Sequence, residues 1–192
     1  MNLTKNISQW GRSLRDKARR GVAATEFALT MPIWVTLLVG ASDGAYALLL
    51  NERTDRIAYT VTDIVSQHQT MTVSNLNDIT LTAGQMMQPF AFGTKGVVIV
   101  TSVYKPPGAA PYICWQYKGG GTLSRNSQVG TPGGAPVLPN GLTINDNDNV
   151  IISEVYYLFT PMFITDHMFP SDTIYRNAVY KPRLSPLITT PG

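Results

Sequence analysis

The stretch RRGVAATEFALTMPIWVTLLVGASDGAYALLL, Arg19–Leu50, decides the fold of this chain. From Phe27 to Leu50 almost every residue is apolar, and at 1.5 Å rise per helical residue this run covers the roughly 30 Å hydrocarbon core of a bilayer. Basic residues precede it: Lys5, Arg12, Arg15, Lys17, Arg19 and Arg20. Because basic flanks stay in the cytoplasm, the sequence predicts a single-pass helix whose C-terminal side lies outside the cytoplasm.

One acid, Glu26, stands near the start of this apolar run. An ionised side chain costs roughly 2.5–3.5 kcal/mol at the centre of a membrane helix and less near its edge, so this acid needs a partner. Gly21 lies five residues earlier, and cutting the Gly21–Val22 bond would leave a new amine on Val22. We therefore expect Glu26 to pair between subunits with that amine. The alternative is a hydrated Glu26 at headgroup level.

A basic leader that ends in glycine, followed by four residues and Glu-Phe, resembles the cleavage signal of type IV prepilins and pseudopilins. The wider segment, Arg19–Leu48, resembles the N-terminus of TadE-like proteins of the tight adherence (Tad, or Flp) pilus system. SEVYYLFTPMF (Ser153–Phe163) and NAVYKPRL (Asn177–Leu184) resemble that family's late strand and closing signature. Between Thr72 and Asn149 there is no resemblance.

The resemblance implies a pilin-like α+β fold, in which the outer half of a long N-terminal transmembrane helix packs on a small antiparallel β-sheet. It also implies cleavage by a prepilin peptidase at Gly21 and Val22, residence in the bacterial inner membrane with the C-terminal domain in the periplasm, and a structural role as a minor pilin. The implied partners are that peptidase, other Tad pilins or pseudopilins, the inner-membrane assembly platform and the lipid bilayer.

Two other classes of protein remain open. The first is a membrane-anchored binding or adhesion module that does not insert into a filament, and the second is an anchored enzyme. Glu26 distinguishes them from a pilin, because a simple anchor has no use for an acid in its apolar entry.

Composition sets independent limits. The chain has 192 residues, 44% of them hydrophobic, which is enough for one membrane helix and one ordinary domain. Its formal charge is +3, but six of its 15 Lys and Arg residues lie in the first twenty positions, so the exported part is near neutral and nucleic-acid binding loses its support. Cys114 is the single cysteine, which excludes an intramolecular disulfide, and we expect it to act as a small buried hydrophobe.

The chain divides into four predicted parts: a leader 1–21, a transmembrane helix 22–50, an amphipathic continuation 51–71, and an α+β domain 72–192 with a long loop 119–149. The continuation has Ile57, Val61, Ile64 and Val65 at helical spacing. A second helix is predicted over Asn75–Gln88, capped by Ser74 and ended by Pro89. Predicted strands cover Gly96–Tyr104 and Tyr112–Lys118, as a hairpin, then Val150–Phe159 and Thr173–Tyr180.

Four further expectations concern the leader and the transmembrane helix. The basic arm before Gly21 is expected to be disordered rather than an amphipathic helix. Pro32 predicts a kink, because it removes a backbone donor. Gly40 and Gly44 have the spacing that lets another membrane helix approach closely, although chance enrichment explains it equally well. Asp43 is expected to meet water at the membrane boundary.

No sequence pattern predicts catalysis, a cofactor or a metal site. Asn145, Asp146 and Asp148 stand in an Asn/Asp run that lacks the glycine and terminal acid of a calcium loop, so we expect a turn there, with a possible ligand or partner contact. The Gly119–Gly121 run lacks the Lys-Ser/Thr ending of a phosphate loop. The surrounding loop is poor in apolar residues and is expected to be a mobile surface excursion, of the kind that often carries binding. The two histidines, His68 and His167, lack zinc-site spacing, and His68 is expected to be a partly buried residue.

Overall fold

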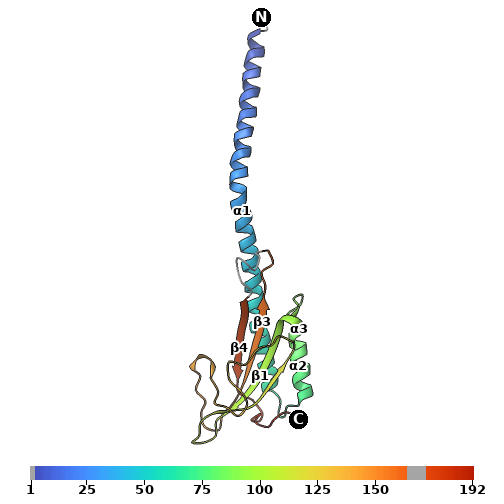
Figure 1. Cartoon of the computed structure of the whole chain (residues 1–192), viewed down its shortest axis with the longest axis vertical. Helices are drawn as coiled ribbons and strands as arrows, with labels where there is room; N and C mark the ends of the chain where they lie inside the picture. Colours follow the sequence, from blue (N-terminus) through green and yellow to red (C-terminus); the bar gives the residue numbers. More distant parts are fainter. Residues whose placement is uncertain (1–2, 164–171) are drawn as a thin grey trace. The chain divides into compact units, whose positions relative to one another are not determined.

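The computed structural model describes residues 3–163 and 172–192, with side chains from Val22 onward except Ala23, so His167 lies outside the described residues (Figure 1). The elements are α1 (Leu3–Ser66), α2 (Val73–Gln85), α3 (Phe92–Lys95), β1 (Gly96–Tyr104), β2 (Tyr112–Gly119), the 3₁₀ turn η1 (Pro139–Gly141), β3 (Asn149–Phe159) and β4 (Asp172–Tyr180). The fold is α+β, with a long N-terminal helix and a small antiparallel sheet. Two compact units, Met1–Gly44 and Ala45–Gly192, are described separately.

The first unit consists of the N-terminal part of α1. The helix begins at Leu3 and runs through Pro32, so the expected disorder of the leader is wrong for this structure, while the expected kink at Pro32 stays a prediction. The Thr36 hydroxyl donates to the Pro32 carbonyl at 2.8 Å, a bond within the same helical stretch. Large apolar side chains are exposed along this unit: Val22, Phe27, Leu29, Met31, Ile33, Trp34, Val35, Leu37 and Leu38.

Within the described residues, α1 is the one helix long and apolar enough to cross a membrane, and its most apolar stretch is only 11% buried. Asp43 differs from these exposed apolar side chains, since it is only 6% exposed and has an interaction partner. The expectation that Asp43 meets water is therefore wrong, and the interaction that it makes offsets part of the cost of burying an acid.

The second unit is built on a four-stranded antiparallel sheet in the order β2-β1-β3-β4. The predicted hairpin of β1 and β2 is confirmed. The second helix differs from the prediction at both ends. Its N-cap is Thr72, whose hydroxyl accepts a hydrogen bond from the Asn75 backbone, rather than Ser74, and α2 ends at Gln85, before the turn that leads to Pro89.

One face of the sheet packs on helices. Side chains from the C-terminal part of α1 (Leu50, Ile57, Ala58, Val61 and Val65) and from α2 (Leu76 and Ala83) share a core with inward residues of β1, β2 and β3. A polar contact joins the layers, because the hydroxyls of Thr62 and Ser153 lie 2.6 Å apart and each is 2.7 Å from the Ala58 carbonyl. The predicted packing of the later part of the helix on the sheet is confirmed, and His68 is partly buried as expected.

The other face of the sheet is covered by the long loop between β2 and β3. Buried Val129 and Ile144 of the loop pack with Val103, Val150 and Ile152 of the sheet. A second cluster joins the loop residue Leu123 to Val97, Ile99 and Tyr156. Most residues of this loop are exposed, as expected of a surface segment, but a few widely spaced apolar side chains pack it onto the sheet as a third layer.

The three glycines Gly119–Gly121 let the chain pass close to its neighbours at the start of this loop. A Cβ built on Gly121 would lie 2.2 Å from the Gly96 carbonyl oxygen, and one on Gly120 would lie 2.7 Å from the Thr80 carbonyl oxygen. Gly120 also has a left-handed φ of 79°. Close backbone approach explains why glycine stands at these positions. The sequence alone indicated only that the run is not a phosphate loop.

Cys114 is the extra residue of an irregularity in the β1–β2 ladder, where Ser102 pairs with Trp115 and Val103 pairs with Ile113. It is half-buried rather than fully buried, and burial raises the pKa of its thiol.

The C-terminal segment after β4 closes the edge of the helix-side core. The Leu187 carbonyl accepts hydrogen bonds from Trp115 Nε1 and Ser102 Oγ, each at 2.7 Å, and Leu187 itself is buried. The Arg183 backbone N–H donates to the Ser66 carbonyl at 2.9 Å, which satisfies an acceptor in the last turn of α1. This segment therefore fastens the end of α1 to the sheet.

Candidate functional site

The predicted cleavage residues lie inside α1. Gly21 and Val22 are helical, and Val22 is 57% exposed. Glu26 is exposed one turn later and stands beside Phe27, which is 65% exposed. Within the described part of the chain, the Glu26 carboxylate forms no ion pair or hydrogen bond, while its backbone carbonyl accepts from the Thr30 hydroxyl at 3.1 Å. Among the described residues this acid therefore stands exposed beside apolar side chains without a side-chain partner.

The two glycines predicted to pack against another helix lie on an open face of α1. A Cβ built on Gly40 or Gly44 would meet no atom within 4 Å. Because residues four apart share a face of a helix, the two glycines form one smooth patch. The geometry leaves room for another helix to approach closely there.

The acidic loop residues predicted as a possible contact site are used inside the protein. Asp146 pairs with Lys105 at 3.0 Å and accepts from the Gly108 backbone N–H at 3.1 Å, and Lys105, followed by Gly108, lowers the pKa of Asp146. Asp148 pairs with Lys181 at 2.5 Å. Asn145 opens the turn, because its carbonyl accepts from the Asp148 backbone N–H at 3.1 Å. The expected turn is confirmed, and the charges of both acids are compensated within the chain.

The loop face of the sheet contains a polar centre that the sequence analysis did not single out. Glu154 lies on β3 opposite Ile99 of β1 and Asn177 of β4, and it is completely buried. Its Oε1 accepts from the Gln128 backbone N–H at 2.8 Å and from the hydroxyls of two tyrosines, Tyr156 and Tyr175, each at 3.1 Å. Its Oε2 accepts from the Ser127 hydroxyl.

Two of these four hydrogen bonds, from Ser127 and Gln128, tie the long loop to the sheet, and the two tyrosines donate from β3 and β4. Burial, and next the negative charge of Glu154, raise the pKa of both tyrosines well above the usual value, so both phenols stay protonated and donate at neutral pH. Their rings also touch, with centroids 4.9 Å apart. The signal in the sequence was a single acid within a strand whose other residues are mostly apolar. Such an acid requires donors on a covered face.

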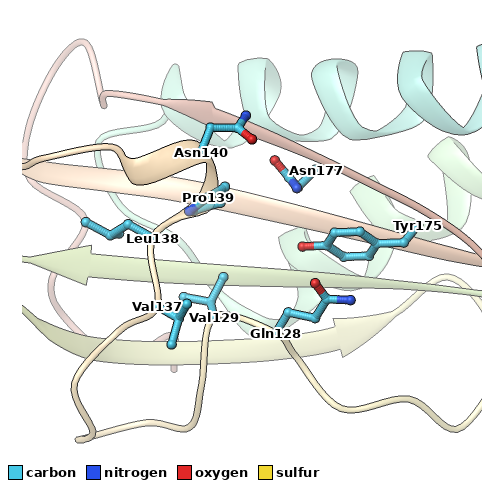
Figure 2. Close-up of a pocket in the computed structure, with 8 residues that line it drawn as sticks. All are labelled: Gln128, Val129, Val137, Leu138, Pro139, Asn140, Tyr175 and Asn177. Carbon is cyan, nitrogen blue, oxygen red and sulfur yellow. The ribbon is translucent and has the colours of Figure 1, made fainter.

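Beside Glu154, the loop and β4 line a small cavity of about 250 Å³ that is open to solvent, which we call the Tyr175 pocket. Figure 2 shows Tyr175 and Asn177 of β4 on one side and the loop residues opposite. The complete lining is Gln128, Val129, Val137, Leu138, Pro139, Asn140, Tyr175 and Asn177. The pocket combines amide groups and a phenol with an apolar wall.

Among the described residues, no group of three or more His, Cys, Asp or Glu side chains is placed to hold a metal ion. The polar groups that the fold brings together here act as hydrogen-bond donors and acceptors. Their arrangement is suited to binding and to holding the loop in place.

Comparison of the chain with protein-family models, with curated proteins and with solved structures finds no match. The function is therefore argued from the residues and the geometry.

Proposed function

We propose that this protein is a structural minor pilin or pseudopilin that joins a Tad-type pilus or its base through its N-terminal helix. The observation that carries the proposal is Glu26, an acid without a partner in the described chain, on a helix whose apolar side chains are exposed. An isolated charge in an apolar environment costs several kcal/mol, and a contact with a cation on a neighbouring subunit removes that cost.

The cation in this proposal is the amine that cleavage creates on Val22. Residues 22 and 26 lie one turn apart on the same helix, so in an array of parallel helices the amine of one subunit and the acid of the next meet at one particular vertical offset. The open patch at Gly40 and Gly44 allows the helices to approach closely enough for that pairing.

The experiment compares Glu26→Ala with Thr30→Ala, a nearby change on the same helix that leaves the acid intact. Each variant is co-expressed with a prepilin peptidase and the pilus assembly proteins. We expect both to be cut before Val22 and to insert in the membrane, with only Glu26→Ala lost from pilus or pilin-complex fractions. Recovery of Glu26→Ala at the level of the unmodified protein would refute the pairing.

Cleavage has its own test. Gly21→Leu should leave residues 1–21 attached, as read by intact mass or N-terminal sequencing. Removal of the leader from Gly21→Leu, or failure to remove it from the unmodified protein, would favour a membrane-anchored binding or adhesion module. The Tyr175 pocket is the observation that favours this second candidate.

A further inference from the structure

The Tyr175 pocket has a hydrogen-bonding lining without a charged side chain. Gln128, Asn140 and Asn177 contribute amides, each of which offers both donors and an acceptor. The side-chain amides of Gln128 and Asn140 form no hydrogen bond to any described residue and are solvent-exposed. These groups are therefore available to a ligand that both donates and accepts.

The Tyr175 side chain and the backbone at Asn140 are held in place before any ligand arrives. Tyr175 is fixed by its hydrogen bond to Glu154 and by its contact with the Tyr156 ring. Asn140 has a left-handed φ of 54°, in the tight η1 turn that begins at Pro139. Figure 2 shows the side-chain amides of Asn140 and Asn177 turned toward one another. Such pre-organisation lowers the ordering cost of binding.

The charge near the pocket selects against anions. Glu154 lies behind Tyr175, is completely buried, and accepts all of its hydrogen bonds from neutral donors. Arg125, a nearby cation of the loop, donates to the Thr173 hydroxyl at 2.5 Å and does not line the pocket. A phosphate or carboxylate in the pocket would meet no lining Lys or Arg to compensate its charge, and the Glu154 carboxylate lies one hydrogen bond away from the lining Tyr175 hydroxyl.

Size and shape restrict the ligand further. A volume of about 250 Å³ is just below the roughly 300–1,000 Å³ of drug-sized ligand sites, so the pocket accepts one ring-sized unit. The valines and Pro139 offer an apolar wall to the less polar face of a ring.

We propose that the Tyr175 pocket binds a neutral carbohydrate unit, with the amides of Gln128, Asn140 and Asn177 bonding its hydroxyls. Hydroxyls on neighbouring carbons both donate and accept, which matches paired amides, and a sugar ring carries apolar C–H surface on its other side. This inference is independent of the proposed pilin function, because it concerns only the loop and the sheet.

The test uses the full chain in lipid nanodiscs, since detergents with sugar headgroups would compete. Saturation-transfer NMR is recorded with methyl α-D-glucoside, D-galactose and N-acetyl-D-glucosamine as neutral probes, and N-acetylneuraminic acid as the anionic probe. At least one neutral sugar should bind, and more tightly than the acid. Binding of none of the neutral sugars, or tighter binding of the acid, would overturn the inference.

Two variants locate the site. Asn140→Gly removes one amide but keeps the left-handed backbone, and Asn177→Ala removes another. Each should weaken binding about fivefold to tenfold, the effect of one lost hydrogen bond, while the exposed helix residue change Gln85→Ala leaves it unchanged. Thermal unfolding checks that each variant is folded. If Asn177→Ala unfolds, Asn140→Gly alone decides, and unchanged affinity in that variant refutes the proposed site.

Discussion

Replacing Glu154 tests whether this acid holds the loop against the sheet. Glu154→Leu keeps a side chain of similar size but removes the acceptor of four hydrogen bonds. The Tyr156 hydroxyl keeps a second acceptor, the Asn126 carbonyl at 3.0 Å, whereas the Gln128 backbone N–H loses its partner. A buried donor left without an acceptor costs about 1–3 kcal/mol.

Two to three such donors lose their acceptor and water can reach part of the loop, so the expected loss is about 3 kcal/mol in the free energy of unfolding. For a domain of this size the loss lowers Tm by about 6–12 °C. Glu154→Gln should lie between Glu154→Leu and the unmodified protein, because an amide oxygen can still accept at the Oε1 position. Glu52→Gln, at an exposed position of α1, is the matched control, and it should stay within about 0.5 kcal/mol.

The assay is urea unfolding together with hydrogen exchange at single amides. The Gln128 amide should lose protection in Glu154→Leu by roughly tenfold for each 1.4 kcal/mol. Amides in β1 should lose protection only to the extent that global stability falls. If Glu154→Leu is within about 0.5 kcal/mol of the unmodified protein, or if the Gln128 amide keeps its protection, the assigned role of Glu154 is wrong.

The remaining predictions concern packing, pH and the domain boundary. Gly121→Ala should destabilise the second unit by several kcal/mol, because the new Cβ would lie 2.2 Å from a carbonyl oxygen. Gly93→Ala is the control, since its new Cβ would meet no atom within 4 Å, and equal Tm values for the two variants would contradict the prediction. Burial raises the pKa of Tyr157 to about 12, so its contribution to stability is complete below the ordinary pKa of 10.0 and is lost as the pH rises toward 12. Urea midpoints from pH 8 to 12, read together with phenolate absorbance, test this. Full ionisation of all tyrosines, Tyr157 included, near pH 10 in the folded protein would refute it. A fragment that begins at Ala45 should be more stable than one that begins at Glu52 by about 2–3 kcal/mol or more, because the shorter one lacks the fully buried Leu50; indistinguishable unfolding curves would exclude this boundary.

The regular elements were predictable because their local patterns are strong. The β-branched run of β1 and the alternation of β2 predicted a hairpin to within one residue. The cap of α2 was not predictable with the same certainty, since Thr72 and Ser74 are both good N-cap residues and the choice depends on where the chain leaves α1. Local preference alone does not decide between two such neighbours.

The candidate site was harder to predict, because it is made by contacts between distant segments. Val129 and Ile144 are isolated apolar residues in a Gly- and Pro-rich loop, and such residues carry no period that would identify a packed layer. Glu154 stood in a predicted strand, but its function in the fold depends on a loop more than twenty residues away. Asp146 illustrates the reverse case, since an apparent ligand group is committed to Lys105.

The two covered faces of the sheet explain why β3 does not alternate between apolar and polar residues. Ser153 and Val155 face the helices, while Ile152 and Glu154 face the loop, and all four are completely buried. A strand buried on both sides offers no free face to a partner. Partners must then use other surfaces, among them the exposed apolar side chains of the first unit and the rim of the Tyr175 pocket. Because these surfaces share no residue, changes at Glu26 should alter assembly without altering sugar binding, and changes at Asn140 should do the opposite.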